Sequence, residues 1–190
     1  MSALPKPYYT VEDYVELLKN SEERFEYFEG QIVAMAGGKL SHSIIAVNTA
    51  SALQTRLTSC RVFNGDAAVK VPTARPFRLP DVSVACGELR TEDFQGIEML
   101  VNPILIVEVL SSTTAQYDRE GKFLAYQSIE SFQEYLLIEQ ERPHVTQYIK
   151  QPNGFWLRRD YIGIESEIEL SAVACTLTLA EIYRDITFES

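Results

Sequence analysis

The sequence predicts an α/β (α+β) fold in which a mixed central β-sheet is flanked by helices. Helical and strand-like patterns are interspersed along the chain, and one segment, ILIVEVL at 104–110, is apolar enough to be a strand buried on both faces. Of the 190 residues, 46% are hydrophobic, and no Gly/Ser-rich or Pro-rich linker divides them. We therefore expect one compact domain over residues 1–190.

The N-terminal third is expected to form a helix, a hairpin and a second helix. Thr10 precedes two acids, which is typical of an N-cap, and predicts a helix to about Lys19. Alternating apolar residues around Glu29-Gly30 predict a hairpin that turns at this pair. Aliphatic residues at near-helical spacing predict a longer helix over about 41–58.

The remaining elements are mostly strands. Residues 61–71 and 81–86 are predicted strands, and the Pro-rich segment between them cannot be a central strand. After the apolar strand, SSTT offers N-caps for a helix of about 115–129. Further strands are expected in EYLLIEQ, VTQYIK and FWLRRDY, with a short closing helix at 178–184.

Composition excludes several classes of protein. No apolar run approaches the roughly 20 residues of a membrane span, and MSALPKPYYT has no signal-peptide core. We therefore expect a soluble, cytoplasmic protein without membrane contact. Three widely spaced cysteines and two histidines argue against a zinc cluster and disfavour a disulfide framework.

The charge pattern bears on nucleic acid binding. A net charge of −10 counts against nonspecific binding through the whole surface. Between Arg56 and Arg78, however, five basic residues stand against the single acid Asp66. This segment is either a local basic face or a solvated loop that happens to be basic.

Two predicted strands carry an acid where a core strand rarely tolerates one. Asp81 follows Pro80 at the start of one strand, and Glu108 lies near the end of the most apolar strand. If these strands are neighbours, the two carboxylates converge beyond the sheet. Two such oxygen ligands suit Mg²⁺ or Mn²⁺, which keeps several waters and leaves room for phosphate oxygens.

The predicted helix that follows supplies a cation. Asp118, Lys122 and Tyr126 are spaced i, i+4, i+8 and therefore share one stripe of that helix. Lys122 could reach back towards Glu108, where an ammonium group can position water or stabilise charge on a phosphate. These are the parts of a metal-dependent phosphodiesterase.

The chain resembles a known family in several ordered segments. Pro80-Asp81, Glu108 and Lys122 resemble the PD-(D/E)XK nuclease superfamily. EGQIVAM at 29–35 followed by His42, RLPDVSV at 78–84, IVEVLS at 106–111, DREGKFLAY at 118–126 and EYLLI at 134–138 are similar to its Uma2 (DUF820) branch. The resemblance runs from about Thr10 to Trp156 and implies a restriction-endonuclease-like fold.

The resemblance also implies site roles. Asp81 and Glu108 correspond to the metal-binding acids, Lys122 to the catalytic lysine and Glu29 to an additional acid from the N-terminal region. The sequence departs from the wider superfamily at Leu110, which stands two residues after Glu108 where the lysine is usual. Lys122 would then be a lysine relocated to the next helix. Ser112 stands where the branch often has proline.

Each candidate also has a purely structural interpretation. Glu108 could be a buried acid in a structural ion pair, and Asp81 a turn acid after proline. Lys122 could form an ordinary helical salt bridge with Asp118, and Glu29 could be a hairpin-tip acid. For His42, a place beside the site and a solvent-facing place are equally open. Tyr126 is expected to pack and hydrogen-bond in the site wall.

Three functions follow from these residues. The leading hypothesis is a Mg²⁺- or Mn²⁺-dependent endonuclease that hydrolyses DNA, with basic residues of 56–78 on the backbone. The first alternative is a catalytically silent nuclease-fold module that binds nucleic acid or a partner protein. The second is a hydrolase of a small phosphorylated substrate. A homodimer is expected by resemblance alone.

Overall fold

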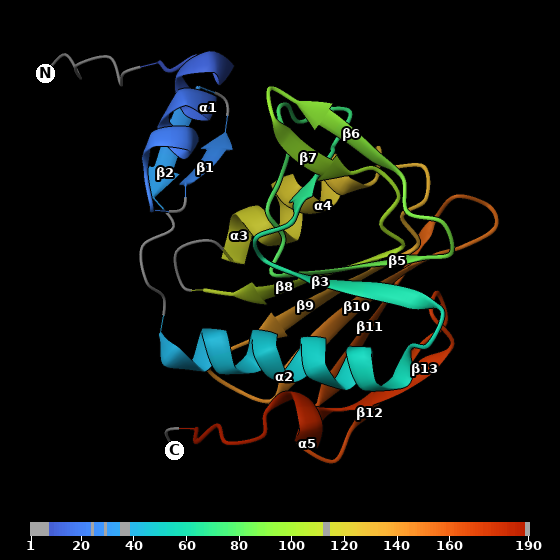
Figure 1. Ribbon diagram of the computed structural model, residues 1–190. Helices are drawn as coiled ribbons and strands as arrows, with labels where there is room; N and C mark the ends of the chain where they lie inside the picture. The colour runs from blue at the N-terminus through green and yellow to red at the C-terminus, as the bar shows by residue number, and fades with distance from the viewer. Residues whose placement is uncertain (1–7, 24, 29, 35–38, 112–114, 189–190) are drawn as a thin grey trace, which may run out of the picture.

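A six-stranded mixed β-sheet forms the centre of the molecule (Figure 1). The computed structural model describes residues 8–23, 25–28, 30–34, 39–111 and 115–188. In spatial order the strands are β11 (Trp156–Ile162), β10 (His144–Lys150), β9 (Glu134–Glu139), β8 (Leu105–Leu110), β5 (Val82–Cys86) and β3 (Cys60–Asn64). Only β8 and β9 pair in parallel, and the other neighbours in this sheet are antiparallel. The predicted mixed sheet is confirmed.

One face of the sheet is covered by α2 (Leu40–Arg56) and α5 (Leu179–Ile182), which lie below it in Figure 1. The hairpin of β12 (Glu167–Leu170) and β13 (Cys175–Thr178) completes this layer. Its buried side chains form the largest apolar cluster, in which Ile45 and Leu53 of α2 meet Val107 and Leu136 of the sheet. The predicted long second helix corresponds to α2.

The other face is covered by a helical segment and a small three-stranded sheet. The small sheet has the order β4 (Ala68–Val69), β7 (Ile97–Leu100) and β6 (Thr91–Phe94). A second apolar cluster joins these elements to the central sheet and contains the buried aromatic rings of Tyr126, Phe132 and Tyr135. Both faces of β8 are therefore buried, as its composition predicts.

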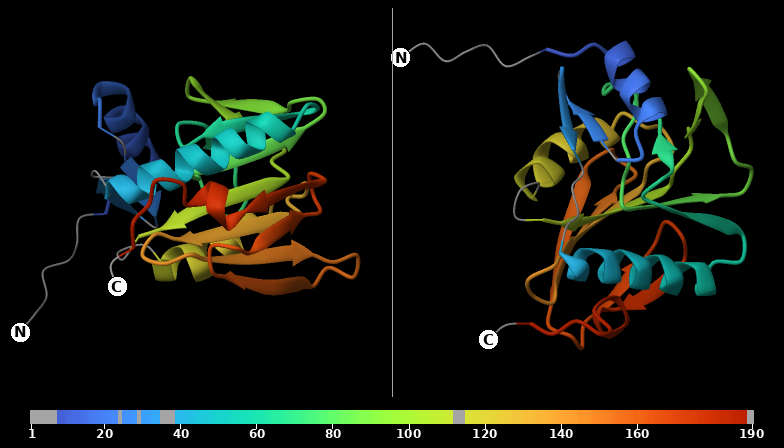
Figure 2. Two further views of the ribbon diagram at one scale, coloured as in Figure 1. Left: turned by 90° about the horizontal axis from the view of Figure 1, so that it is seen from below. Right: turned by 60° about the vertical axis from the view of Figure 1, so that its left-hand side comes forward.

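The N-terminal residues form a lobe above this layer (Figures 1 and 2). Helix α1 (Val11–Asn20) begins where predicted, because Thr10 and Asp13 form a capping box. The lobe also contains the hairpin of β1 (Phe25–Phe28) and β2 (Gln31–Ala34), and Gly30 in its turn has a φ of +80°. A third apolar cluster holds the lobe against Phe77 and Leu79.

The helical segment after β8 is less regular than predicted. It consists of α3 (Ala115–Tyr117), a π-helical turn at Asp118–Lys122 and α4 (Phe123–Tyr126). Residues 127–129 form tighter turns in place of a continued helix, since the amide of Ile129 bonds to the carbonyl of Tyr126. The prediction of one regular helix over 115–129 is therefore wrong in both its regularity and its end.

The predicted strand at 61–71 is also wrong, because it is divided. A turn at Asn64, Gly65 and Asp66 separates β3 from β4, and the side chains of Asn64 and Asp66 hydrogen-bond within it. Strand β4 then leaves the central sheet and pairs in parallel with β7.

No helix among the described residues is long and apolar enough to cross a membrane.

Two of the three cysteines form a disulfide, contrary to expectation. Cys60 of β3 lies directly opposite Cys86 of β5, with a Cα–Cα distance of 3.9 Å, and the two are joined. The two cysteines are 26 residues apart in sequence, and only the strand register brings them together. Cys175 is a free, partly buried thiol.

This arrangement predicts the thiol count and a stability change. Under denaturing, non-reducing conditions a thiol reagent should label Cys175 alone, and after reduction it should label all three cysteines. The double substitution of Cys60 and Cys86 by alanine should lower the free energy of unfolding by about 3 to 4 kcal/mol, because a loop of this length is no longer closed. Cys175→Ala is the matched control. Three reactive thiols before reduction would contradict the disulfide.

Candidate active site

Asp81 and Glu108 meet at one end of the central sheet. Val82 pairs with Val107 in the antiparallel β5–β8 ladder, so the next residues outward are Asp81 and Glu108. Asp81 Oδ2 accepts a 2.7 Å hydrogen bond from the amide of Val109, which ties this carboxylate to β8. The two strands are neighbours, which is the condition under which the sequence predicts that the carboxylates converge.

Lys122 lies at the centre of the carboxylates. Its Nζ is 3.0 Å from Asp118 Oδ1, 3.2 Å from Glu108 Oε1 and 3.6 Å from Glu26 Oε1. Only 5% of the lysine side chain is exposed. An ordinary salt bridge on a solvated helix face, the structural interpretation of Lys122, does not describe this buried contact with three acids.

The stripe predicted for Asp118, Lys122 and Tyr126 faces Glu108. The hydroxyl of Tyr126 donates a 2.8 Å hydrogen bond to Glu108 Oε1, and both residues are buried. Asp118 is also buried, and its carbonyl accepts a hydrogen bond from Tyr135. The π-helical turn spans Asp118 to Lys122, so the irregular part of the helix is the part that presents the acid and the ammonium.

His42 contributes from α2. It lies in the first turn of that helix, and its Nε2 is 3.0 Å from Asp81 Oδ1. The hydrogen bond with Asp81 raises the pKa of His42 above its usual value of 6.5, against the opposing effect of burial. Of the two interpretations that the sequence left open, the structure places His42 beside Asp81.

Glu26 is a member of this cluster that sequence reasoning missed. It lies on β1, its side chain is 13% exposed, and its buried Oε1 has no hydrogen bond within the described chain. The sequence prediction chose Glu29 of the same hairpin, which lies outside the described residues. Tyr27 points into the lobe core, and strand alternation therefore turns Glu26 the other way. That alternation was the available signal.

The cluster carries more negative than positive charge. Three carboxylates (Glu26, Glu108 and Asp118) lie within 3.6 Å of the one ammonium group, and the charge of Asp81 also acts on Glu108. Burial raises the pKa of Glu108 well above its usual value; Lys122 opposes this effect, whereas the neighbouring acids add to it. Burial acts to lower the pKa of Lys122, but Glu108, Glu26 and Asp118 outweigh it and raise that pKa well above its usual value. Lys122 is therefore a cation and a hydrogen-bond donor at neutral pH.

The donor set fits a hard divalent cation with a largely water ligand shell. Mg²⁺ needs only one or two protein carboxylates, and Asp81 and Glu108 supply them. The buried Oε1 of Glu26 has no hydrogen bond within the described chain, and the acids of the cluster outnumber its one ammonium group, which leaves negative charge for a cation to balance. Within the described part of the chain, no three His, Cys, Asp or Glu side chains already form a complete ligand set.

Three of the five basic residues of segment 56–78 are engaged within the protein, whereas Arg61 and Arg75 are exposed. Arg78 is only 4% exposed and donates hydrogen bonds to the carbonyls of Tyr27 and Phe77. Arg56 is paired with Glu181, and Lys70 with Glu92. The expectation that Arg78 contacts DNA is wrong, because its guanidinium group is used inside the protein.

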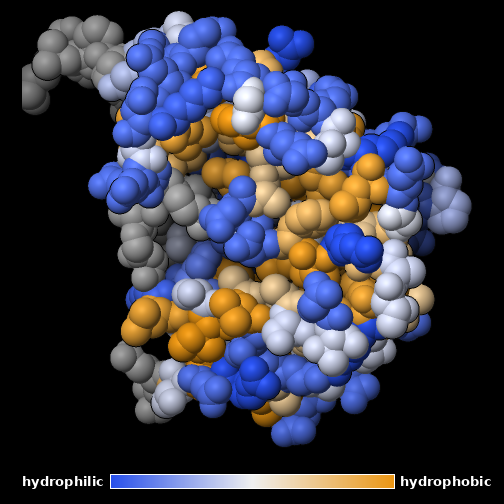
Figure 3. Space-filling view, viewed as in Figure 1, coloured by the Kyte–Doolittle hydropathy of each residue, from blue (hydrophilic) through white to orange (hydrophobic). Residues whose placement is uncertain are grey.

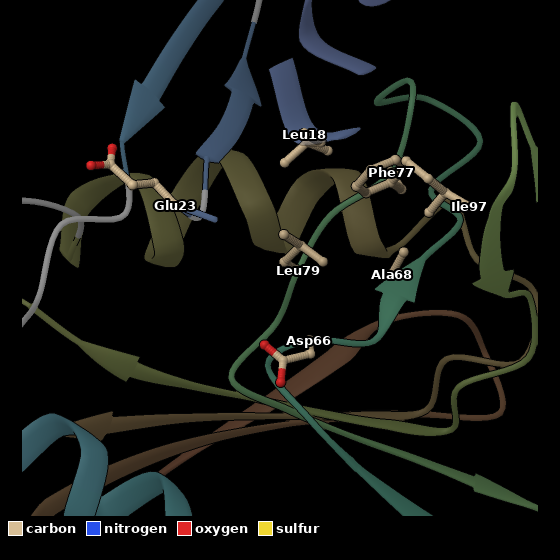
Figure 4. A pocket seen from close by; sticks show the side chains of 7 residues that line it. All are labelled: Leu18, Glu23, Asp66, Ala68, Phe77, Leu79 and Ile97. Carbon is tan, nitrogen blue, oxygen red and sulfur yellow. The ribbon is translucent and has the colours of Figure 1, made fainter. Parts of the chain in front are cut away.

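One surface hollow lies apart from the carboxylates. It measures about 170 Å³ and is lined by Leu18, Glu23, Asp66, Ala68, Phe77, Leu79 and Ile97 (Figure 4). Apolar surface is visible in this part of the molecule in Figure 3. No member of the carboxylate cluster lines this hollow, so the cluster is not at its floor.

The buried hydrogen bond to Glu108 can be tested by removing one hydroxyl. Tyr126→Phe should lower the free energy of unfolding by about 1 to 3 kcal/mol, since it leaves a buried carboxylate with one donor fewer. Urea denaturation measures this change. Tyr148→Phe is the matched control. The ring of Tyr148 also packs against other aromatic rings, and its hydroxyl has no described hydrogen bond. Equal effects in both variants would contradict the assigned bond.

The pairing of His42 with Asp81 predicts a pH effect with a definite sign. The pKa of His42 is raised by folding, so its stabilisation is complete below about 6.5 and is lost as the pH rises through the folded-state pKa. NMR titration should place His42 above 6.5, and Asp81→Asn should lower it. His144, the second histidine, serves as the internal reference. A wild-type midpoint at or below 6.5 would refute the pairing.

Comparison with known proteins places this chain in a family. The sequence pattern of the Uma2 family, described as "Putative restriction endonuclease", matches residues 11–180. Two uncharacterized proteins of Synechocystis sp. are similar to this chain. Protein slr1290 is 33% identical over 97% of this chain and 96% of its own length, and protein sll1609 is 30% identical over 85% and 92%.

A solved structure shares the fold. The crystal structure of a "putative nuclease belonging to DUF820" from Anabaena variabilis aligns with a TM-score of 0.70, over 91% of this chain and 96% of the other. At 19% identity this likeness establishes the architecture alone, and it confirms the predicted restriction-endonuclease-like fold. Together with the match over residues 11–180, it shows that the chain belongs to the Uma2 (DUF820) family.

Proposed function

We propose that this protein is a metal-dependent endonuclease that hydrolyses phosphodiester bonds in DNA. The observation that carries the proposal is the convergence of Asp81, Glu108 and Lys122 at one end of the sheet, with Lys122 buried among acids. The description of the Uma2 family is consistent with this reaction class.

In the proposed mechanism, Asp81 and Glu108 would hold Mg²⁺ or Mn²⁺. When bound, the cation would lower the pKa of a water molecule and offset charge on the phosphate. The amide of Val109 and the ring of His42 fix the Asp81 carboxylate, while Tyr126 fixes Glu108. Glu26 and Asp118 position Lys122 through its ammonium group.

Lys122 acts as a hydrogen-bond donor in this scheme. Because the surrounding acids raise its pKa, it does not take a proton from water at neutral pH. It orients the attacking water and stabilises the negative charge that grows on the phosphate oxygens in the transition state. Its burial in a region of low effective dielectric strengthens both effects.

The proposal is tested by cleavage of supercoiled and linear DNA in Mg²⁺, Mn²⁺ or EDTA. Asp81→Asn should reduce metal-dependent cleavage on the order of 100-fold or more, because it removes a charge and keeps the side-chain shape. Asp185→Asn is the matched control, since this acid is 82% exposed and outside the cluster. Full activity in folded Asp81→Asn protein would refute the site.

Lys122→Ala is a less discriminating variant. Removing one partner of a buried ion pair typically costs about 3 to 5 kcal/mol, so lost activity could follow from lost structure. Asp81 lies partly exposed at the rim of the cluster, which makes its substitution the more informative test.

A second candidate function is a catalytically silent nuclease-fold module that binds nucleic acid or a partner protein. The net charge of −10 and the internal use of Arg78 favour it. It retains the fold and does not require a metal.

Calorimetry with Mn²⁺ separates the two functions. An endonuclease should bind the ion, and Asp81→Asn should weaken this binding at least about tenfold, the scale seen when a group that supports a metal site is altered. Asp185→Asn should bind as the wild type does. If folded wild-type protein neither binds Mn²⁺ nor cleaves DNA, the result favours the silent module.

A further inference from the structure

Strand β11 is the outermost strand of the central sheet. It pairs with β10 and with no other strand of the described chain. The hairpin of β10 and β11 forms one rim of the sheet in Figure 2, at the opposite side from β3. An edge strand presents unpaired N–H and C=O groups, and proteins usually shorten, charge or cover such an edge.

This edge is long and rich in exposed apolar side chains. β11 has seven residues from Trp156 to Ile162. Phe155 and Ile162 at its two ends are each 73% exposed, and Leu157 is 40% exposed. Apolar exposure at both ends of an unpaired edge is the pattern expected of a strand that receives another strand.

A second copy of the same strand would fit this edge in one register. A two-fold axis perpendicular to the sheet keeps each side chain on its own face, so a residue can oppose only itself or one an even number of positions away. The candidate centres are therefore single residues, namely Arg158, Arg159 and Asp160. Each centre fixes every other pair.

Of these three, the register centred on Arg159 gives the best match of charge and hydropathy, although it sets Arg159 against itself. It places Arg158 of each copy opposite Asp160 of the other copy, so two such pairs form. It also places Trp156 opposite Ile162, and Leu157 opposite Tyr161. The register centred on Arg158 opposes Trp156 to Asp160, whereas the register centred on Asp160 opposes two carboxylates and sets Arg158 against Ile162.

We propose that two copies of this chain pair antiparallel through β11 about Arg159, which joins their central sheets into one continuous sheet. The occupant of the edge is thus a second copy, chosen by the complementarity of Arg158 and Asp160. This interface goes beyond the proposed function, because it holds whether or not the protein cleaves DNA.

The charged pair is suited to this role. The Arg158 side chain is 54% exposed and already lies 3.0 Å from Asp160 in its own chain, so it stands at the edge beside the acid. Partial burial acts to raise the pKa of Asp160, but hydrogen bonds from Arg158, Thr146 and His144 bring it down to about 2. The acid is therefore ionised throughout the usual pH range. The two Arg159 side chains at the centre repel each other, and their removal should strengthen the pairing.

Cysteine cross-linking tests the register. Directly opposed residues of antiparallel strands have Cα atoms about 4.5 to 5.5 Å apart, within the range of a disulfide. In a Cys175→Ser background, Arg159→Cys should therefore form a cross-linked dimer under mild oxidation. Leu157→Cys, the control, would lie about 13 Å from its own copy and should stay uncross-linked. Cross-linking in both variants, or in neither, would overturn the register.

Charge reversal tests the contact between copies. Arg158→Asp gives a strand with acids at both 158 and 160, and Asp160→Arg gives a strand with arginine at 158, 159 and 160, so each variant should sediment as a monomer. Mixed together, the two should form a heterodimer of about twice the 21.5 kDa chain mass, because both cross-copy pairs are restored. Intrachain pairing of residues 158 and 160 stays broken in each variant, so rescue on mixing reports the contact between copies alone.

The outcomes separate cleanly. Dimeric wild type, monomeric single variants with native circular dichroism and a mixed heterodimer support the interface. Leu124→Asp, at a residue 71% exposed on α4, should leave the wild-type mass unchanged. Wild-type protein that sediments as a monomer at every concentration, or a dimer that both reversals leave intact, would overturn the proposal, and neither result bears on the cleavage assay.

Discussion

The arrangement of this protein depends on the neutralisation of Glu108. A carboxylate within β8, a strand buried on both faces, loses hydration that only close polar partners can replace. Lys122 supplies the charge and Tyr126 a hydroxyl donor, and both come from the segment that follows β8. The helical segment packs back over the sheet, and its π-helical turn carries both Asp118 and Lys122, whose side chains lie 3.0 Å apart.

The candidate site is assembled from five elements, of which β8 and the π-helical turn are close in sequence. The hairpin supplies Glu26, α2 supplies His42, the β5–β8 pair supplies its two acids, and the π-helical turn supplies Lys122. The first two come from opposite layers of the molecule (Figure 1). The acids thus meet where the layers meet, at the end of the sheet and away from the apolar hollow.

The sequence predicted those parts of the fold that are set by local pattern. The apolar run of β8, the capping residue Thr10 and the helical spacing of α2 each correspond to an observed element. Asp81 and Glu108 could be placed together because an acid in an apolar strand is conspicuous. Relations set by tertiary contact were not predictable in this way: the Cys60–Cys86 pair depends on strand register, and the turn at Gly65 diverts β4 into another sheet. Glu26 was missed because the sequence prediction chose Glu29 and did not use the strand alternation that turns Glu26 away from the face of Tyr27.

The buried Arg78 fastens the N-terminal hairpin to the chain segment that leads into Asp81. Its guanidinium group bonds to the carbonyls of Tyr27 and Phe77, that is, to main-chain atoms that every residue type possesses. These hydrogen bonds therefore do not depend on which side chains the hairpin carries. Exposed positions such as Gln31 and Val33 are free to diverge while Glu26 keeps its place beside Lys122. The hairpin thus separates a fixed inner surface from an outer surface open to evolutionary change.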